Sequence, residues 1–191
     1  MWAIAGVFLT TAVVAAGPVL AGCGSSVNGG GTPAASTTST SGSGLAKDVP
    51  KGFDPCTGIP ESVLASENLR ATDRADVDAP GGVMWRGCAW VRRNGYSVSI
   101  RTTNLSVGAV RDRHFTDAQE FTIDGRRAIS TRQFEGPHVM EACTVDVEMK
   151  GGSLEFNLNN PPSNKDTGSL DSCQLARSLA EKVMPSVPAG A

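Results

Sequence analysis

The five cysteines constrain the fold of this 191-residue chain more than any other feature of its sequence. Cys23 closes an apolar run, whereas Cys56, Cys88, Cys143 and Cys173 lie in the mixed sequence that follows. None of the intervals among these four is as short as the CxxC pair typical of a structural zinc site. In an exported chain, four such cysteines predict two disulfides and no metal site.

The first 22 residues are apolar, contain no charged side chain and predict a signal peptide. They lead into LAGC at residues 20–23, which resembles the bacterial lipobox, where a diacylglycerol is attached to the cysteine sulfur and the peptide is cut before it. We therefore predict lipidation at Cys23. A membrane-spanning anchor is the alternative, but Gly17 and Pro18 interrupt the run. A signal normally opens with basic residues, so we expect the true start codon upstream.

The remaining chain divides into a linker and one domain. Residues 23–52 are rich in Gly, Ser and Thr and nearly lack large apolar side chains, which predicts a flexible linker that begins at the lipidated cysteine. Whether its hydroxyl residues carry O-linked sugars stays open. Residues 53–188 have the length and composition of a single domain with one core. This organisation predicts a lipid-anchored protein on the extracytoplasmic face of the cell membrane.

The clearest local signal is a β-hairpin around Asn94-Gly95, a dipeptide that favours a two-residue turn because both positions tolerate positive φ. A two-residue turn here pairs Val91 with Val98 and places them on one face. Arg92 and Arg101 then lie together on the other face, which mixes arginines with a tryptophan and a cysteine.

Two more hairpins are predicted, with turns at Asp124-Gly125 and at Gly151-Gly152. Short helices are expected over 60–66 and after Ser106, and a longer one near the C-terminus is stopped by Pro185. The segment 70–82 is interpreted as an exposed loop. Together these elements predict an α+β domain: an antiparallel β-sheet built from hairpins, with an N-terminal and a C-terminal helix packed on it.

Four cysteines allow three disulfide pairings, and the sequence alone does not choose among them. The expected local geometry favours Cys56 with Cys88 and Cys143 with Cys173, because each of these pairs would join a helix end to a strand.

Several motifs resemble those of a domain of unknown function in lipoproteins of mycobacteria, nocardiae and related actinobacteria. They are FDPC at 53–56, GCAW at 87–90, the later Cys143, and SCQLARSLAEKVMPSVP at 172–188, all following a lipobox. The resemblance implies a cell-envelope location and two disulfides, and it supplies no catalytic residues. We also expect a fold similar to the PsbP and Mog1 type.

The residues that an enzyme would need are sparse. The two histidines, His114 and His138, are interpreted as surface residues, and the chain lacks GxSxG, HExxH and glycine-rich phosphate motifs. Asp146 and Glu148 share a strand face, which we interpret as solvated rather than catalytic. Few aromatic residues are available for stacking, so nucleic acid is not an expected partner. We predict no catalysis and no cofactor.

The central part of the chain, residues 86–132, is basic, with nine arginines against four acids. Arg92 and Arg101 are therefore predicted to contact anionic lipid head groups, while ordinary solvated arginines remain the alternative. The leading hypothesis is a domain that binds an envelope protein or component. The alternative is a carrier that holds a lipid or another small apolar ligand in an internal pocket.

Overall fold

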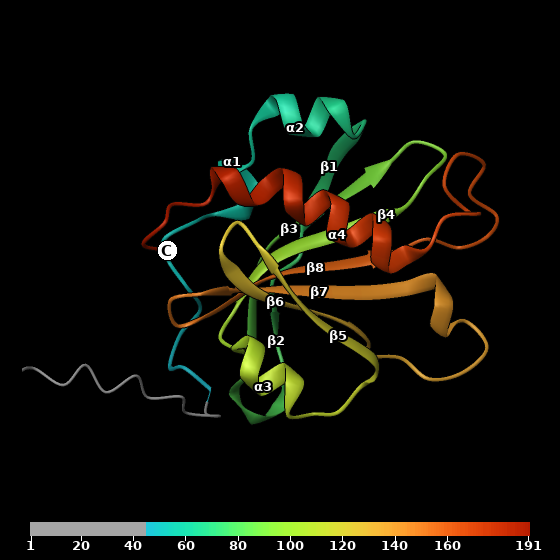
Figure 1. Ribbon diagram of the computed structural model, residues 1–191. Helices are drawn as coiled ribbons and strands as arrows, with labels where there is room; N and C mark the ends of the chain where they lie inside the picture. Colours follow the sequence, from blue (N-terminus) through green and yellow to red (C-terminus); the bar gives the residue numbers. More distant parts are fainter. Residues whose placement is uncertain (1–44) are drawn as a thin grey trace, which may run out of the picture. The chain divides into compact units, whose positions relative to one another are not determined.

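A computed structural model describes residues 45–191 (Figure 1). The predicted signal peptide, the lipidation site at Cys23 and the linker up to residue 44 lie outside this part. The strands are β1 (Leu69–Arg74), β2 (Val77–Asp78), β3 (Met84–Arg92), β4 (Ser97–Thr103), β5 (Thr116–Ile123), β6 (Arg126–Arg132), β7 (Ala142–Met149) and β8 (Gly152–Asn159). The helices are α1 (Pro55–Gly58), α2 (Glu61–Ser66), α3 (Val107–Arg111) and α4 (Ser172–Val183), with short 3-10 turns at η1 (Pro80–Gly82), η2 (Val139–Glu141) and η3 (Met184–Ser186).

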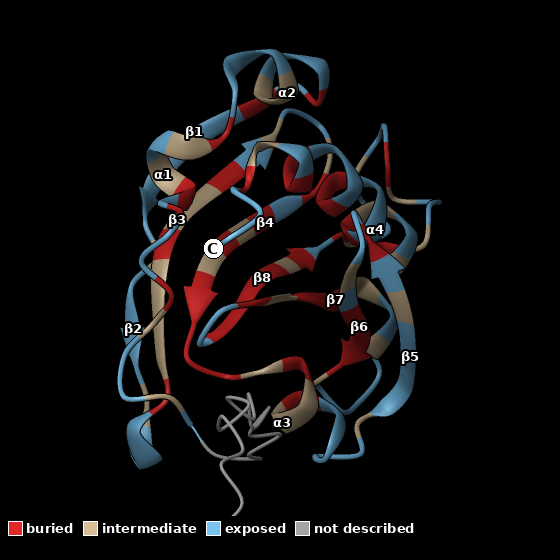
Figure 2. Cartoon of the chain, turned by 60° about the vertical axis from the view of Figure 1, so that its left-hand side comes forward, coloured by how far each residue is buried: buried red, intermediate tan, exposed pale blue. Residues whose placement is uncertain are grey.

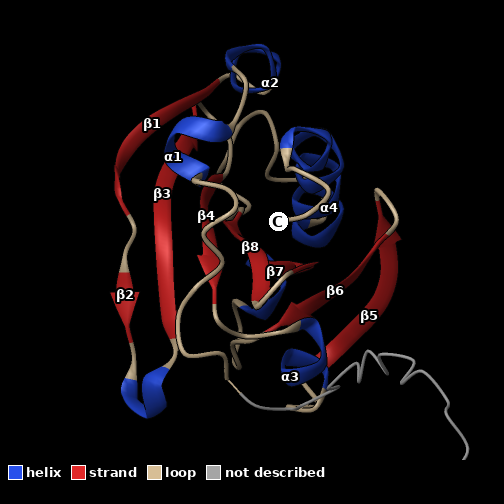
Figure 3. Ribbon diagram, turned by 90° about the vertical axis from the view of Figure 1, so that its left-hand side faces the viewer, coloured by secondary structure: helices blue, strands red, loops and turns tan. Residues whose placement is uncertain are grey.

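All strand pairs are antiparallel, and the sheet has the order β1-β3-β4-β8-β7-β6-β5, with β2 also paired to β3. The sheet curves around α4, which lies against its inner face (Figure 3). The predicted α+β class, with an antiparallel sheet and helices packed on it, is confirmed.

The inner face of the sheet carries the apolar core (Figure 2). Alternate residues of β7 and β8 point toward α4, and Val145, Phe156 and Leu158 are completely buried. From the helix, Leu179 and Val183 are buried against them. The period-2 pattern of the strands and the 3.6-residue stripe of the helix thus meet in one cluster, as the sequence predicts.

The β3–β4 hairpin adopts a register one residue away from the predicted one. Trp90 pairs with Val98 and Val91 with Ser97, because the loop contains three residues, 93–95, with Asn94 at φ 57°. A shift of one residue exchanges the two faces of a strand. Trp90 therefore enters the core at 2% exposure, whereas Val91 faces solvent.

Other predicted turns and loops have mixed outcomes. Asp124 and Gly125 form the two-residue turn between β5 and β6, both with positive φ, as predicted. The β7–β8 turn consists of Lys150 and Gly151, one residue earlier than predicted. The segment 70–82, interpreted as a loop, contains most of β1 and all of β2, so that interpretation is wrong. β1 pairs only with β3, and five of its six residues are exposed, so its sequence lacks the alternating burial that marks a strand.

Two disulfides join helices to the sheet. Cys56 of α1 is bonded to Cys88 of β3, and Cys143 of β7 is bonded to Cys173 of α4, with Cα–Cα distances of 5.3 and 5.0 Å. Both pairs are those that the sequence favours.

The domain has two ends, which lie at opposite sides of Figure 1. The chain joins the domain where Ala46 exchanges backbone and side-chain hydrogen bonds with Asn104, next to the β7–β8 turn; we call this the tether end. The far end holds the start of β7, the end of β6 and the beginning of α4. An eight-residue strand is roughly 26 Å long, so β7 separates the two ends by about that distance.

Candidate binding surface at the far end

Exposed apolar side chains gather at the far end of the domain. Six large apolar side chains within residues 45–191 are exposed by 40% or more: Leu45, Val77, Val91, Phe134, Met140 and Leu170. The last three are the most exposed, at 58, 58 and 50%, and all lie in the two loops of the far end. We call Phe134, Met140 and Leu170 the far-end patch. Exposed apolar residues concentrated in one region, unlike ones scattered singly, are typical of interaction sites.

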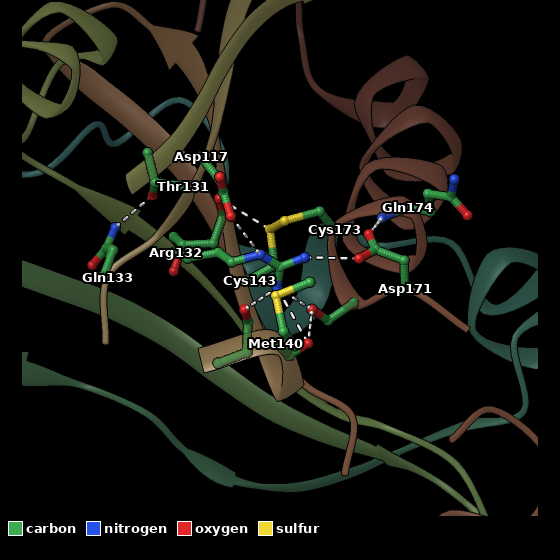
Figure 4. The surroundings of a disulfide bond; sticks show 12 residues. Asp117, Thr131, Arg132, Gln133, Met140, Cys143, Asp171, Cys173 and Gln174 are labelled. Atoms are coloured by element: carbon green, nitrogen blue, oxygen red, sulfur yellow. Dashed lines mark hydrogen bonds and ion pairs between the residues drawn. A yellow bond between two sulfur atoms is a disulfide. The ribbon is translucent and has the colours of Figure 1, made fainter. Parts of the chain in front are cut away.

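Arg132 at the end of β6 holds this region together (Figure 4). Its guanidinium is almost fully buried and donates to the carbonyl oxygens of Met140 and Ala142, at 3.2 and 2.9 Å. It also donates to Ser172 Oγ at 2.9 Å and to Asp171 Oδ2 at 2.7 Å. One side chain therefore fixes η2 against the first turn of α4.

Asn160 joins the two loops of the far end. Its backbone N–H donates to the carbonyl of Glu141 at 2.7 Å, and its side chain donates to the carbonyls of Thr167 and Leu170 at 2.7 and 3.0 Å. Leu170 is thereby held beside the 3-10 turn that carries Met140. The patch rests on hydrogen-bonded backbone, which preorganises its apolar side chains for a partner.

The helix start beneath the patch is defined by its own sequence. Asp171 is the N-cap of α4, and its Oδ1 accepts from the backbone N–H of Gln174 at 2.9 Å. The Cys143–Cys173 disulfide lies in the same place and ties the first turn of α4 to β7 (Figure 4). A covalent bond and a buried guanidinium thus secure the same corner.

A cleft of about 440 Å³ opens beside the patch, between the β5–β6 hairpin and α4. Its lining is mixed: Met140 and Phe121 are apolar, while acidic and basic side chains come from both walls. The guanidinium of Arg177 lies over the Phe121 ring, 4.3 Å from its centroid. Such a surface offers apolar contact and paired charges together, as protein interfaces do.

A second polar cluster lies on the outer face of the sheet and is buried. Glu155 accepts from Trp85 Nε1 at 2.7 Å and from Arg101, while Asp146 accepts from Ser153 Oγ at 3.1 Å. Asp146 is 1% exposed and Glu155 3%, so the interpretation of this face as solvated is wrong for Asp146. Burial, and then the negative charge of Glu155, raise the pKa of Asp146 well above its usual value.

This outer cluster is sealed from large ligands. Within residues 45–191, Asp146 Oδ2 and Arg101 Nε are buried without a hydrogen-bond partner. The guanidinium of Arg101 also lies 5.5 Å from the centroid of the Trp85 ring. With its two carboxylates nearly inaccessible, the cluster acts within the fold and does not present a surface to a partner.

The two arginines predicted to contact anionic lipids are not brought together. Arg92 and Arg101 lie on opposite faces of the β3–β4 hairpin, because the register is shifted by one residue. Arg92 pairs with Glu67 at 3.3 Å, and Arg101 pairs with Glu155 and is only 15% exposed. They cannot act jointly on one surface. The sequence reasoning also missed the far-end patch, whose only local signal is large apolar residues inside loops rich in Pro, Gly and charged residues.

Comparison with known proteins adds a family but no activity. The family described as "Protein of unknown function (DUF3558)" matches residues 18–186. No curated protein and no solved structure matches the chain significantly, so the likeness to PsbP and Mog1 stays a prediction. Within residues 45–191, no helix has both the length and the apolar character needed to cross a membrane. In the same part, no three His, Cys, Asp or Glu side chains gather in a way that would hold a metal ion.

Proposed function

We propose from the far-end patch that this chain, a member of the DUF3558 family of unknown function, is a non-catalytic lipoprotein that binds another protein of the cell envelope. The lipid on Cys23 would hold it at the cell membrane, and the domain would lie on the extracytoplasmic face. The lipobox at residues 20–23 and the likeness to actinobacterial lipoproteins support the anchor.

One observation carries the binding proposal: the three most exposed large apolar side chains of residues 45–191 all lie in the loops at the end of the domain opposite the tether. Leaving these side chains in water costs free energy that burial in an interface would recover. Their position at the far end supports a partner that approaches from the side away from the anchoring membrane.

The carrier hypothesis receives less support. The core beneath α4 is filled by large side chains, among which Trp90, Phe156 and Leu158 are at most 2% exposed. The lining of the cleft beside the far-end patch is more polar than apolar, whereas pockets for lipids are mainly apolar. Partner binding therefore fits the described residues better than storage of an apolar ligand.

The patch is tested by replacing Met140 and Leu170 together with Glu in the full chain. Val77 and Val91, which are about 40% exposed and lie outside the patch, provide a matched control when both are replaced with Glu. Proteins crosslinked in intact cells would be identified by mass spectrometry. We expect a protein that is captured by the wild type and the control variant and lost with the patch variant. Equal capture by all three would overturn the proposal.

The anchor is tested separately by labelling cells with a radioactive fatty acid. The wild type should incorporate the label, and a Cys23→Ala variant should not. Label retained by the variant would show that lipidation is not at Cys23.

A further inference from the structure

The tether end of the domain carries an excess of positive charge. Five basic side chains lie on the joining segment and on the two β-turns beside it, against three acidic ones. The basic residues are Lys47, Lys51, Arg126, Arg127 and Lys150, and the acidic ones are Asp48, Asp124 and Glu148. The loops of the far end, residues 133–141 and 160–171, show the reverse, with four acidic side chains and one lysine.

The acidic residues of the tether end do not neutralise it. Lys51 pairs with Asp48 at 2.6 Å and Arg127 with Glu148 at 3.3 Å. All of these side chains except Glu148 are exposed by half or more, and exposed pairs are weak. Within residues 45–191, Lys150 at the tip of the β7–β8 turn is exposed and takes part in no ion pair. This end can therefore accept further negative charge.

Three of the basic residues, Arg126, Arg127 and Lys150, and two of the acidic ones, Asp124 and Glu148, border an open cleft of about 910 Å³ between the two β-turns and the C-terminal segment. Arg126 forms one wall and is fixed in place, because it donates to the carbonyl of Pro188 at 2.6 Å and to a carboxylate oxygen of Ala191, the last residue, at 2.9 Å. Arg127 and Lys150 stand at the rim and keep their charges in solvent. The cleft is large enough for a phosphate-bearing head group, and its walls supply guanidinium and ammonium donors.

We propose that the tether end binds the phosphate groups of anionic phospholipids in the membrane that anchors the chain. The inference rests on the proposed lipid anchor, which would attach the chain at this end and so favour its approach to the head groups over that of the far end. Each basic residue near an anionic membrane strengthens binding roughly fivefold. The acidic loops of the far end would be repelled, so the domain would stand with its far-end patch directed away from the membrane.

The orientation is tested with the lipidated protein in nanodiscs, by the reactivity of its lysines toward an amine-modifying reagent. Lys150 reports on the tether end, and Lys165, in a far-end loop, is the internal control. In discs that contain phosphatidylglycerol, we expect the reactivity of Lys150 relative to Lys165 to fall severalfold compared with phosphatidylcholine discs. High salt should restore it, because the attraction is screened.

Two variants distinguish binding at the cleft from a general effect of surface charge. Arg127→Glu should reduce the protection of Lys150 about fivefold or more, since it reverses a charge at the rim. Arg93→Glu, an exposed site at the β3–β4 turn, should leave the protection unchanged. Equal Lys150 reactivity in both kinds of disc would overturn the head-group surface while leaving the anchor in place. Failure of the protein to incorporate into either disc would instead overturn the anchor, and this inference with it.

Discussion

Asp146 on β7 and Glu155 on β8 lie directly opposite each other, and both residues are buried, while the Arg101 guanidinium pairs with Glu155. Two neighbouring buried carboxylates are costly, and the cost is relieved when one of them holds a proton. Glu155 already accepts from Arg101 and Trp85, so its charge is stabilised. Asp146 accepts only from Ser153, and its pKa is the one that burial and the charge of Glu155 raise.

This arrangement predicts that the contribution of Asp146 to the stability of the domain falls as the pH rises. The folded state binds a proton at Asp146 that the unfolded chain has already released. The stabilisation is complete below the ordinary pKa of 3.8 and is lost as the pH rises through the higher pKa of the folded state. The nearby charges of Glu155, Arg101 and Arg113 set where that loss occurs.

Asp146→Asn removes the titrating group and keeps the shape, so the free energy of unfolding should depend less on pH. Urea unfolding across the range from acid to mildly alkaline pH measures this. The free energy of unfolding of the variant should rise relative to that of the wild type as the pH increases. Asp166→Asn, an exposed control, should have the same pH profile as the wild type. Parallel pH profiles for Asp146→Asn and the wild type would contradict the assignment.

Glu67 titrates in the opposite sense. Burial pushes its pKa up, but hydrogen bonds from Lys182 and Tyr96, together with the charges of Lys182 and Arg92, outweigh burial and hold the pKa below its usual value. Its contribution is therefore present above the unfolded pKa of 4.5 and is lost as the pH falls through the folded pKa.

Glu67→Gln should lower the free energy of unfolding at neutral pH by about 1–2 kcal/mol, because hydrogen bonds to a charged group are replaced by neutral ones and the half-exposed Lys182 is screened. The difference from the wild type should shrink in acid. Chemical denaturation at neutral and acidic pH tests this, with Glu61→Gln as an exposed control on the same helix. A deficit that stays constant in acid would show that the charge of Glu67 is not what stabilises the fold.

Gly87 is required by the close approach of two strands. A Cβ at this position would lie 2.2 Å from the Ile100 carbonyl oxygen and 3.1 Å from Arg101 Cγ. Gly87→Ala should therefore displace β4 and reduce the free energy of unfolding by about 1–3 kcal/mol. Gly108→Ala is the control, since its nearest neighbour is 3.7 Å away in α3 and it should stabilise by about 1 kcal/mol or less. Equal effects of the two would remove the steric argument.

The elements that follow from local pattern were predictable. The apolar stripe of α4, the Ser106 N-cap of α3 and the Asp124-Gly125 turn depend on residues close together in the chain, and all three are present. The pairing of Cys143 with Cys173 also followed from neighbouring elements.

The predictions that were wrong, and the features that were missed, depend on contacts between segments that are distant in the sequence. The dipeptide Asn94-Gly95 indicates a turn but does not tell whether Arg93 belongs to it. Because Arg93 does belong to the loop, the register shifts by one residue, and the β3 side chains that share a face with Val98 are the opposite set from the predicted one. Alternation places Asp146 on the outer face, but only Arg101, Glu155 and Trp85 from other strands show that this face is buried. The far-end patch likewise needs two loops that are remote in sequence to meet at Asn160.

The two disulfides should contribute equally to stability and unequally to partner binding. Each closes a loop of about the same length, with sequence separations of 30 and 32, so replacing either pair with Ala should cost about 3–4 kcal/mol in the loop-entropy model. Loss of Cys143–Cys173 also releases the first turn of α4 beneath the far-end patch, whereas Cys56–Cys88 joins α1 to β3, away from it. Urea unfolding and crosslinking of the partner in cells, carried out on both double variants, measure the two effects. We expect similar losses of stability in the two variants, with partner capture reduced only by Cys143→Ala/Cys173→Ala. Equal capture by both variants would show that the Cys143–Cys173 disulfide does not organise the binding surface.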